Sequence, residues 1–326
     1  MRSLGDGPGE RHQQAELNLN KAVRISFDIA VSAILAFACL ADASLANAQA
    51  AVFRRTLEVG LKDPVVLDIV VETGDLAIGY NRDGEVSIYA SGKDSAGNSA
   101  TEEYFNSHLI LEQDANHITL RNNQDVSESV FSVSYRIDVP FRTQINSSVL
   151  KTGNQRVIGV TGPVKMASGE GNIDATYVRF ALVQATTGKG RISCTRVAHV
   201  SAETGSGNIT LLEDGSSKAV VKSGFGRIEI GGARGSVEAA TQSGDVHIKA
   251  VLDGDWRLSS VNGNIRIELP PRASFEINAD TISGAISIER DGIENPSELV
   301  HEFHQKVNNG GKHIEAHSGS GNIYIQ

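Results

Sequence analysis

Four histidines near the C-terminal end form the densest group of potentially reactive side chains in this sequence: His301, His304, His313 and His317. A His-x-x-His pair with two further imidazoles nearby could hold zinc if the segment folded back on itself. Residues 302–307 instead continue an alternating strand pattern into Asn308-Asn309-Gly310-Gly311, a strong signal for a tight turn. We therefore expect a hairpin that carries surface histidines, and we predict no metal site.

Catalysis would need convergent carboxylates, or a carboxylate with a basic partner, on neighbouring segments. Two columns that should face outward can be read around a glycine that recurs through the C-terminal half. Three residues after it stand Asp174, Ser193, Thr210, Glu229, His247, Arg266, Ser287 and Tyr324. Four residues before it stand Ala167, Thr186, Glu203, Lys222, Ala240, Ser259, Asp280 and His317. Because the acids are isolated, we expect a solvated face and no catalytic residues.

Amides, carboxylates and one thiol complete the inventory of candidate groups. Directly after the recurring glycine come Asn172, Arg191, Asn208, Arg227, Asp245, Asn264, Ala285 and Asn322, which could form a structural ladder or a strip that binds a glycan. Calcium-binding β-rolls need an aspartate in every turn, and this column has only Asp245, so calcium is not expected. Cys194 falls in an apolar column and is interpreted as a small buried hydrophobe. The sequence thus predicts no cofactor.

The elements that position these groups are repeats. The pattern Gly-x-Ile/Val-x-apolar is anchored at Gly171, Gly190, Gly207, Gly226, Gly244, Gly263, Gly284 and Gly321, with steps of 19, 17, 19, 18, 19, 21 and 37 residues. Three residues before each anchor stands a hydroxyl: Ser168, Thr187, Thr204, Ser223, Thr241, Ser260, Thr281 and Ser318. Apolar residues alternate with period 2 on both sides of the anchor, which indicates two short strands per coil with the glycine at the bend. The hydroxyls are expected to satisfy turn amides or to pair coil to coil.

A single-chain, all-β, β-helix-like solenoid of ~19-residue coils is therefore predicted. The step of 37 residues indicates a degenerate coil or an excursion between Arg290 and Lys312. Gln242, Val261 and Ile282 replace a glycine found two residues before other anchors, and those coils are expected to bend differently. We divide the chain into 1–50, an N-terminal extension and signal peptide; 51–165, an irregular β part; and 166–326, a regular repeat with an insertion near 291–312.

The first fifty residues have the features of an export signal. Lys21 and Arg24 precede the apolar stretch 29–40, and small residues follow it, which predicts cleavage after Ala48 or Ala50. A retained anchor is the alternative, but the stretch is shorter than the ~20 residues that span a bilayer. Lipidation at Cys39 is a second alternative. The exported chain is expected in the periplasm, at the cell surface or in the medium, with no transmembrane segment.

Composition narrows the class of partner. Beyond residue 50 the chain has 26 basic and 34 acidic residues, a net charge of −8, so neither a nucleic-acid surface nor a polybasic membrane patch is expected. Cys194 is then the only cysteine, so no intrachain disulfide can form. Thirty-three glycines with 5% aromatic residues favour many tight turns between short strands.

These repeats resemble the bacterial putative-adhesin family of unknown function, whose strands carry the signature Ser/Thr-Gly-x-Gly-Asn/Asp-Ile/Val-x-Ile. The segments that carry the resemblance are Gly74-Asp75-Leu76-Ala77-Ile78, Ile137-Asp138-Val139-Pro140, Gly310-Gly311 and Ser318-Gly319-Ser320-Gly321-Asn322-Ile323. The resemblance covers nearly all of residues 51–326. It implies a β-helix-like solenoid outside the cytoplasm, with adhesion as the function and no catalytic residues to carry over.

Three hypotheses of function follow. The first is an exported, non-enzymatic adhesin or envelope scaffold that contacts glycans, envelope components or proteins through its flat faces. The second is a carbohydrate-active enzyme, a polysaccharide lyase or hydrolase, on the same architecture. The third is end-to-end self-association, because the chain ends at Gln326 directly after a strand and could leave an open coil edge.

Overall fold

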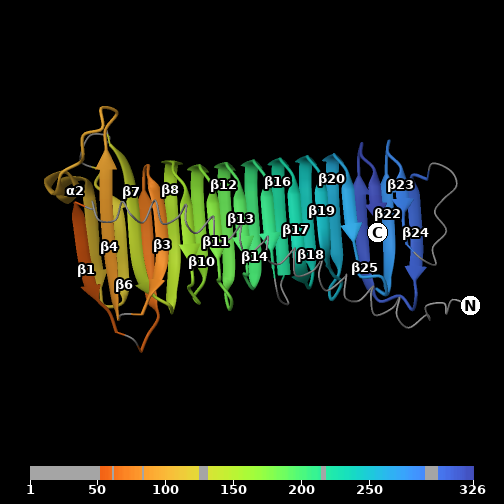
Figure 1. Ribbon diagram of the computed structural model, residues 1–326, viewed down its shortest axis with the longest axis horizontal. Helices are drawn as coiled ribbons and strands as arrows, with labels where there is room; N and C mark the ends of the chain where they lie inside the picture. The colour runs from red at the N-terminus through yellow and green to blue at the C-terminus, as the bar shows by residue number, and fades with distance from the viewer. Residues whose placement is uncertain (1–51, 61, 83, 125–130, 214–217, 291–299) are drawn as a thin grey trace, which may run out of the picture. The chain divides into compact units, whose positions relative to one another are not determined.

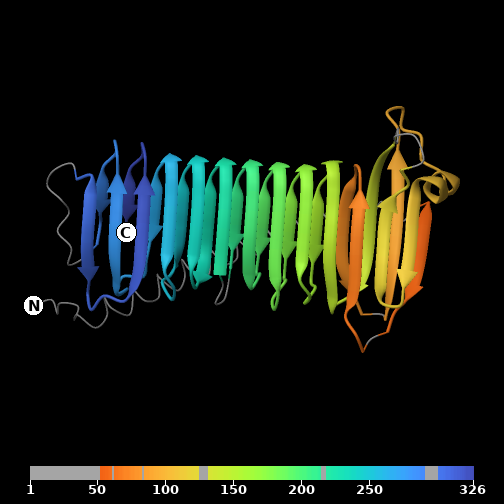
Figure 2. The same ribbon diagram turned by 180° about the vertical axis from the view of Figure 1, so that it is seen from behind.

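Two sheets built from short strands make up the fold. The structure is a computed structural model, and it describes residues 52–326 apart from 61, 83, 125–130, 214–217 and 291–299. The expected extension and signal peptide lie outside the described residues, as does Cys39. Figures 1 and 2 show the strands of residues 52–326 side by side along one stack.

The described residues form two sheets of thirteen strands. Sheet A contains, in spatial order, β1 (Phe53–Glu58), β4 (Glu85–Lys93), β7 (Ser132–Pro140), β3 (Asp75–Asn81), β9 (Gln155–Ile158), β11 (Ile173–Thr176), β13 (Ile192–Thr195), β15 (Ile209–Leu212), β17 (Ile228–Arg234), β19 (Val246–Val251), β21 (Ile265–Glu268), β26 (Ile323–Ile325) and β23 (Ile286–Ile288). Sheet B contains β24 (Glu302–Val307), β22 (Phe275–Thr281), β25 (Lys312–Ser318), β20 (Trp256–Asn262), β18 (Val237–Ser243), β16 (Lys218–Phe225), β14 (His199–Ser206), β12 (Leu182–Lys189), β10 (Val164–Glu170), β8 (Thr143–Thr152), β2 (Val65–Val71), β6 (His117–Asn122) and β5 (Leu109–Asp114).

Each regular coil gives one strand to sheet B and the next strand to sheet A. The register pairs equivalent positions of successive coils: Val183 with Val200 in sheet B, and Ile192 with Ile209 in sheet A. These apolar side chains are buried between the sheets, as the period-2 alternation requires. The prediction of an all-β, β-helix-like solenoid is confirmed.

Successive coils lie so close together at the recurring glycine that a side chain would clash with the backbone of the neighbouring coil. A Cβ atom on Gly190 would lie 2.0 Å from the carbonyl oxygen of Gly171, and the φ of Gly190 is +147°. Gly207 meets Gly190 in the same way, at 2.1 Å. The column extends to Gly153 and Gly74, which lie in contact although 79 residues separate them. The irregular N-terminal part therefore continues the same stack.

The C-terminal strands do not end the stack. β25 lies between β20 and β22, and β26 lies between β21 and β23, so the coil of Gly321 is inserted between the coils of Gly263 and Gly284. The expectation of an open coil edge after Gln326 is wrong for this reason. The end of the stack is instead formed by β23 and by β24, which pairs antiparallel with β22.

The expected turn at 308–311 is present, but it does not close a hairpin. Asn308, Gly310 and Gly311 all have positive φ, and the Gly310 N–H donates to the Val307 carbonyl at 3.0 Å. The strands that this turn joins, β24 and β25, lie on opposite sides of β22 and do not pair with each other.

The N-terminal end of the stack is closed by antiparallel strands and one short helix. β4 pairs antiparallel with β1 and β7, and β5 pairs antiparallel with β6. Helix α2 (Glu102–His108) packs there through the buried Phe105. Among the described residues, no helix has the length and apolar character needed to cross a membrane.

Candidate ligand-binding pocket

The hydroxyl column connects each coil to its neighbour. Thr187 Oγ1 donates to the carbonyl of Gly171 at 3.0 Å, and Thr204 Oγ1 donates to that of Gly190 at 3.1 Å. The same bond recurs at all eight positions, at 2.8–3.1 Å, and every one of these side chains is buried. The expected coil-to-coil pairing is confirmed, so the column has a structural role.

The asparagine column is a ladder as well. Asn172 Oδ1 accepts the backbone N–H of Arg191, and Asn208 Oδ1 accepts that of Arg227, both at 2.9 Å. Asp245, Asn264 and Asn322 accept the next coil's N–H at the same distance. Because these oxygens hold the neighbouring coil, the structural alternative is confirmed for them.

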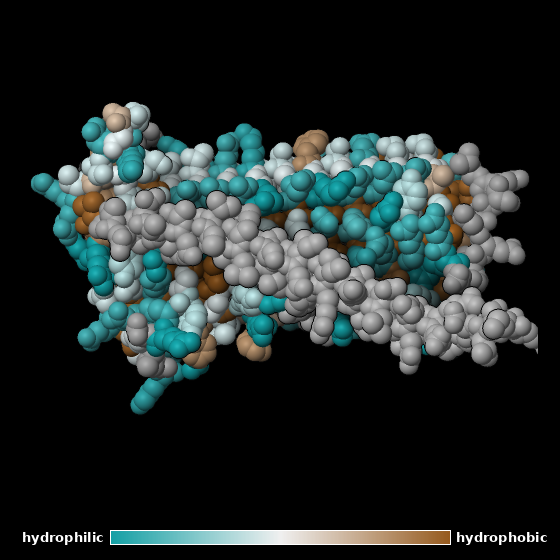
Figure 3. Space-filling model, viewed as in Figure 1, coloured by the Kyte–Doolittle hydropathy of each residue, from teal (hydrophilic) through white to brown (hydrophobic). Residues whose placement is uncertain are grey.

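Carboxylates in and beside the two outward columns are paired with cations. Asp174 lies 3.7 Å from Arg191, and burial raises the pKa of Asp174 against the opposing effect of Arg191 and Arg156. Glu268 Oε1 lies 2.9 Å from His247, and Oε2 lies 2.9 Å from Lys249. Figure 3 shows hydrophilic side chains over much of the visible face of the regular coils. We therefore interpret the columns as part of a solvated surface on which acidic and basic side chains form ion pairs.

The histidines lie apart along the outer face of sheet B. His317 contacts Asp280, His304 contacts Asn278, and His313 Nδ1 lies 3.5 Å from Glu276. His301 is exposed, and its carbonyl accepts the Thr281 N–H. No group of three His, Cys, Asp or Glu side chains among the described residues could hold a metal ion.

Cys194 is fully buried in the core, and burial raises the pKa of its thiol to about 12. Such a thiol remains protonated and is a poor nucleophile. The substituted positions Gln242 and Val261 do not interrupt the ladder, because Ser243 still pairs with Asn262 beside them. Val261 and Ile282 are exposed.

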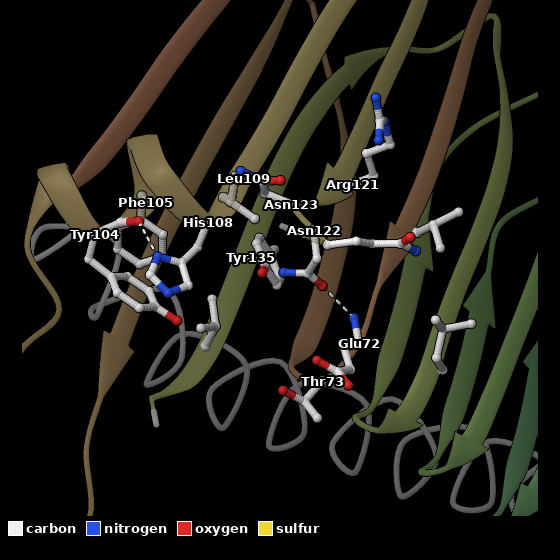
Figure 4. A pocket seen from close by; sticks show the side chains of 14 residues that line it. Glu72, Thr73, Tyr104, Phe105, His108, Leu109, Arg121, Asn122, Asn123 and Tyr135 are labelled. Atoms are coloured by element: carbon white, nitrogen blue, oxygen red, sulfur yellow. Dashed lines mark hydrogen bonds between the residues drawn. The ribbon is translucent and has the colours of Figure 1, made fainter. Parts of the chain in front are cut away.

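A pocket of about 390 Å³ lies at the N-terminal end, beneath helix α2, where the sequence suggested no site. Its apolar wall is formed by Phe105, Leu109, Val133 and Tyr135, and two exposed side chains, Val70 and Leu150, stand at its rim. Figure 4 shows the polar side chains that face this hollow from the strands and the helix. A concave site with apolar walls and a few placed polar groups is the usual form of a small-ligand site.

Helix α2 positions the aromatic side of the pocket. Thr101 caps the helix, since its Oγ1 accepts the Tyr104 N–H at 3.2 Å, and Glu102 and Glu103 fill the first turn. The His108 ring stacks on the Tyr104 ring with centroids 3.9 Å apart (Figure 4). His108 Nδ1 also lies 2.9 Å from the Tyr104 carbonyl, which fixes the imidazole.

Amides and one phenol form the polar side. Asn122 Oδ1 accepts the Glu72 N–H at 2.5 Å, and Asn123 Nδ2 donates to the Ser107 carbonyl at 3.0 Å, so both amides are held in place. Burial raises the pKa of Tyr135, whose hydroxyl therefore stays protonated and able to donate. Arg121 and Gln124 complete this side.

Sequence reasoning missed this pocket for a physical reason. Its walls come from strands and a helix far apart in the chain, outside the regular repeat. A local signal that could have helped is Thr101 followed by Glu102 and Glu103, because an N-cap residue before acidic residues predicts a helix start. Tyr135 and Asn122 belong to no repeating pattern, so the sequence could not predict that they lie close together beneath that helix.

Comparison with known proteins identifies the family of this chain. Residues 66–326 match the family model described as Toastrack DUF4097. Similar solved structures include a putative lipid binding protein from Parabacteroides distasonis, at 12% identity over 83% of this chain and 96% of that chain with a TM-score of 0.46. A putative adhesin from Bacteroides fragilis shows 13% identity over 84% and 96%, with a TM-score of 0.40. A putative cell adhesion protein from Clostridium sporogenes shows 11% identity over 84% and 98%, with a TM-score of 0.22.

No curated protein matches the chain. The family model nevertheless spans most of the sequence, including all the regular coils and nearly all strands of the N-terminal part. The resemblance to a bacterial putative-adhesin family of unknown function is thereby confirmed: the chain belongs to the Toastrack DUF4097 family.

Proposed function

We propose that this protein is an exported, non-enzymatic binding protein of the bacterial envelope, with adhesin-like contact to glycans as its function. The pocket beneath α2 would be its principal binding site, and the regular coils would be the scaffold that presents it. The outward columns of the regular coils would have no specific ligand.

One observation carries the proposal: the pocket combines a fixed aromatic stack with fixed amides. The Tyr104 and His108 rings offer a flat apolar surface, while Asn122, Asn123 and Gln124 offer groups that donate to and accept from hydroxyls. Sugars present hydroxyl edges and apolar ring faces together. The site therefore matches a glycan better than a purely apolar ligand.

The alternative function, a carbohydrate-active enzyme, has less support from the same pocket. Glycoside hydrolysis uses two carboxyl groups about 5 to 9.5 Å apart across the scissile bond. Glu72 is the one carboxylate among the described lining residues, and it pairs with Lys151 at 2.6 Å. Arg121 is paired with Glu112 at 3.3 Å. These pairings favour binding over acid-base chemistry.

A glycan array and a whole-cell binding assay test the proposal. Leu150→Asp places a charge at the rim of the pocket, where 57% of the Leu150 side chain is exposed, and should abolish binding without unfolding the protein. Leu212→Asp is the matched control, because Leu212 is 51% exposed and lies on β15, far along the stack. Equal binding by both variants, or no glycan bound by the unaltered protein, would refute the proposal.

Export has its own test. Mass spectrometry of the protein recovered from outside the cytoplasm should show a chain that starts at Gln49 or Ala51. A protein that retains Met1 would contradict the proposed signal peptide, and lipid on Cys39 would contradict the proposed cleavage sites.

A further inference from the structure

A second cavity, of about 340 Å³, lies at the opposite ends of the same N-terminal strands. It is formed where β2 begins, where β3 ends and at the turn between β7 and β8. The lining residues that matter are Asp63, Tyr80, Asn81, Arg82, Phe141 and Arg142. Glu72 and Thr73 of the first pocket lie beyond the other end of β2, so the two sites are separate.

Two aromatic side chains stand exposed at this cavity. Phe141 is 52% exposed and Tyr80 is 45% exposed. Neither is on a loose segment: the Phe141 carbonyl accepts the Thr161 N–H at 2.7 Å, and the Tyr80 ring packs over Gly159. Rigidly presented rings next to a hollow mark a binding surface.

The described residues that line the cavity carry a net positive charge. Among them, Arg82 and Arg142 supply two guanidinium groups, and Asp63 supplies a carboxylate. Arg82 Nε donates to the Tyr80 hydroxyl at 3.3 Å, and Arg142 Nη1 donates to the Lys62 carbonyl at 3.4 Å. Among the residues that the structure describes, neither guanidinium has a carboxylate partner within salt-bridge distance. Each retains donors with the fork geometry that suits a carboxylate.

We propose that this cavity binds a carboxylated sugar unit, such as the uronic acid of an acidic glycan. The sugar carboxylate would accept from Arg82 and Arg142, and the apolar ring face would lie on Tyr80 or Phe141. An anionic membrane surface could meet the arginines and the exposed rings, but a flat surface would not fill a hollow of about 340 Å³. The sugar therefore accounts for the hollow, the two arginines and the exposed rings together.

A titration of the full chain by NMR, with methyl glucuronoside and methyl glucoside as the probes, tests this inference. We expect the glucuronoside to bind about tenfold more tightly or better, the effect of one charge-assisted hydrogen bond. The double substitution Arg82→Ala/Arg142→Ala should abolish that preference. Phe141→Ala should weaken binding of both sugars.

Arg179→Ala/Phe180→Ala is the matched control, because Phe180 is 78% exposed outside both cavities. It should leave the titration unchanged, and circular dichroism should show that every variant is folded. Equal affinity for the two sugars, or an unaltered preference in the double arginine variant, would overturn the inference. Binding to vesicles containing phosphatidylglycerol, lost in Phe141→Ala without any glucuronoside binding, would overturn it in favour of a membrane surface. Loss of array binding in Leu150→Asp would not bear on this site.

Discussion

At the scale of single residues, the tightest steric restriction is the short distance between the anchor glycines of successive coils. The Cα of Gly190 leaves no room for a methyl group, because the Gly171 carbonyl oxygen would be 2.0 Å away. Backbone atoms cannot move aside without parting the two coils. The anchor glycine is therefore set by stacking as well as by its φ.

Gly190→Ala should lower the free energy of unfolding by roughly 3 kcal/mol or more, as severe overpacking and backbone strain do. Gly97→Ala is the control: Gly97 also has positive φ, at +86°, but a Cβ there would meet nothing within 4 Å. It should cost about 1 kcal/mol. Urea denaturation measures both, and equal losses would show that φ alone, and not the coil contact, requires the glycine.

Cys194 provides a second test at this scale. Since burial raises the pKa of the thiol to about 12, the protonated form is favoured in the folded state. Its contribution to stability is complete below the unfolded thiol pKa of about 8.5 and is lost as pH rises toward 12. Iodoacetamide at pH 8 should modify Cys194 only at the rate of unfolding. Rapid, stoichiometric alkylation of the folded protein would contradict its burial.

The residue columns were the most predictable part of this protein. Glycine, hydroxyl and apolar positions repeat, and each repeat has one physical role, so the role of Thr204 could be inferred from Thr187. The pockets lack that redundancy. Asn122 and Tyr135 occur once each, and their meeting depends on how β6, β7 and α2 fold together.

At the scale of elements, the notable feature is the insertion of β25 and β26 into the stack. The sequence pattern identified the coils of Gly284 and Gly321 equally well, and both have the expected strands. It could not assign their spatial order, because any coil of this pattern can stack on any other. β24 fixes this order. It pairs antiparallel with one edge of β22, and the turn after it leads the chain to β25, which pairs parallel with the other edge of β22.

Deleting residues 312–326 should therefore do more than remove the last segment. β20 and β21 would lose their partners on one side, and β22 and β23 would lose the strands β25 and β26 that join them to the other coils. Hydrogen exchange should show loss of protection in 275–288 and 302–307, with protection retained in β10 to β19. Retained protection in β22 would contradict the inserted order.

At the scale of the whole solenoid, both ends of the described stack are closed by strands that resist further pairing. The outer strand of sheet B at the C-terminal end, β24, exposes Glu302, His304 and Lys306, and the outer strand of sheet A, β23, has three residues. At the other end, β1 carries Arg54 and Arg55. Charged and short edge strands oppose sheet-to-sheet association.

The protein should accordingly be a monomer by size-exclusion chromatography with light scattering, even at high concentration. The hypothesis of end-to-end association depended on an open coil edge after β26, but β26 is paired on both sides, with β21 and β23. A mass that rises with concentration in multiples of the chain would contradict this reading and restore that hypothesis. Replacing Lys306 with Val provides a sensitised variant, since it removes a charge from the β24 edge.

The central claim is that the coils are scaffold and that ligand binding occurs at the N-terminal end. Hydrogen exchange of the full chain, with and without a glycan selected on the array, tests it most directly. We predict slower exchange in the turn at 72–73, in α2 and in 121–124, with the regular coils β10 to β21 unchanged. Protection that instead follows the outward rows of those coils would place function on the repeat and contradict the account.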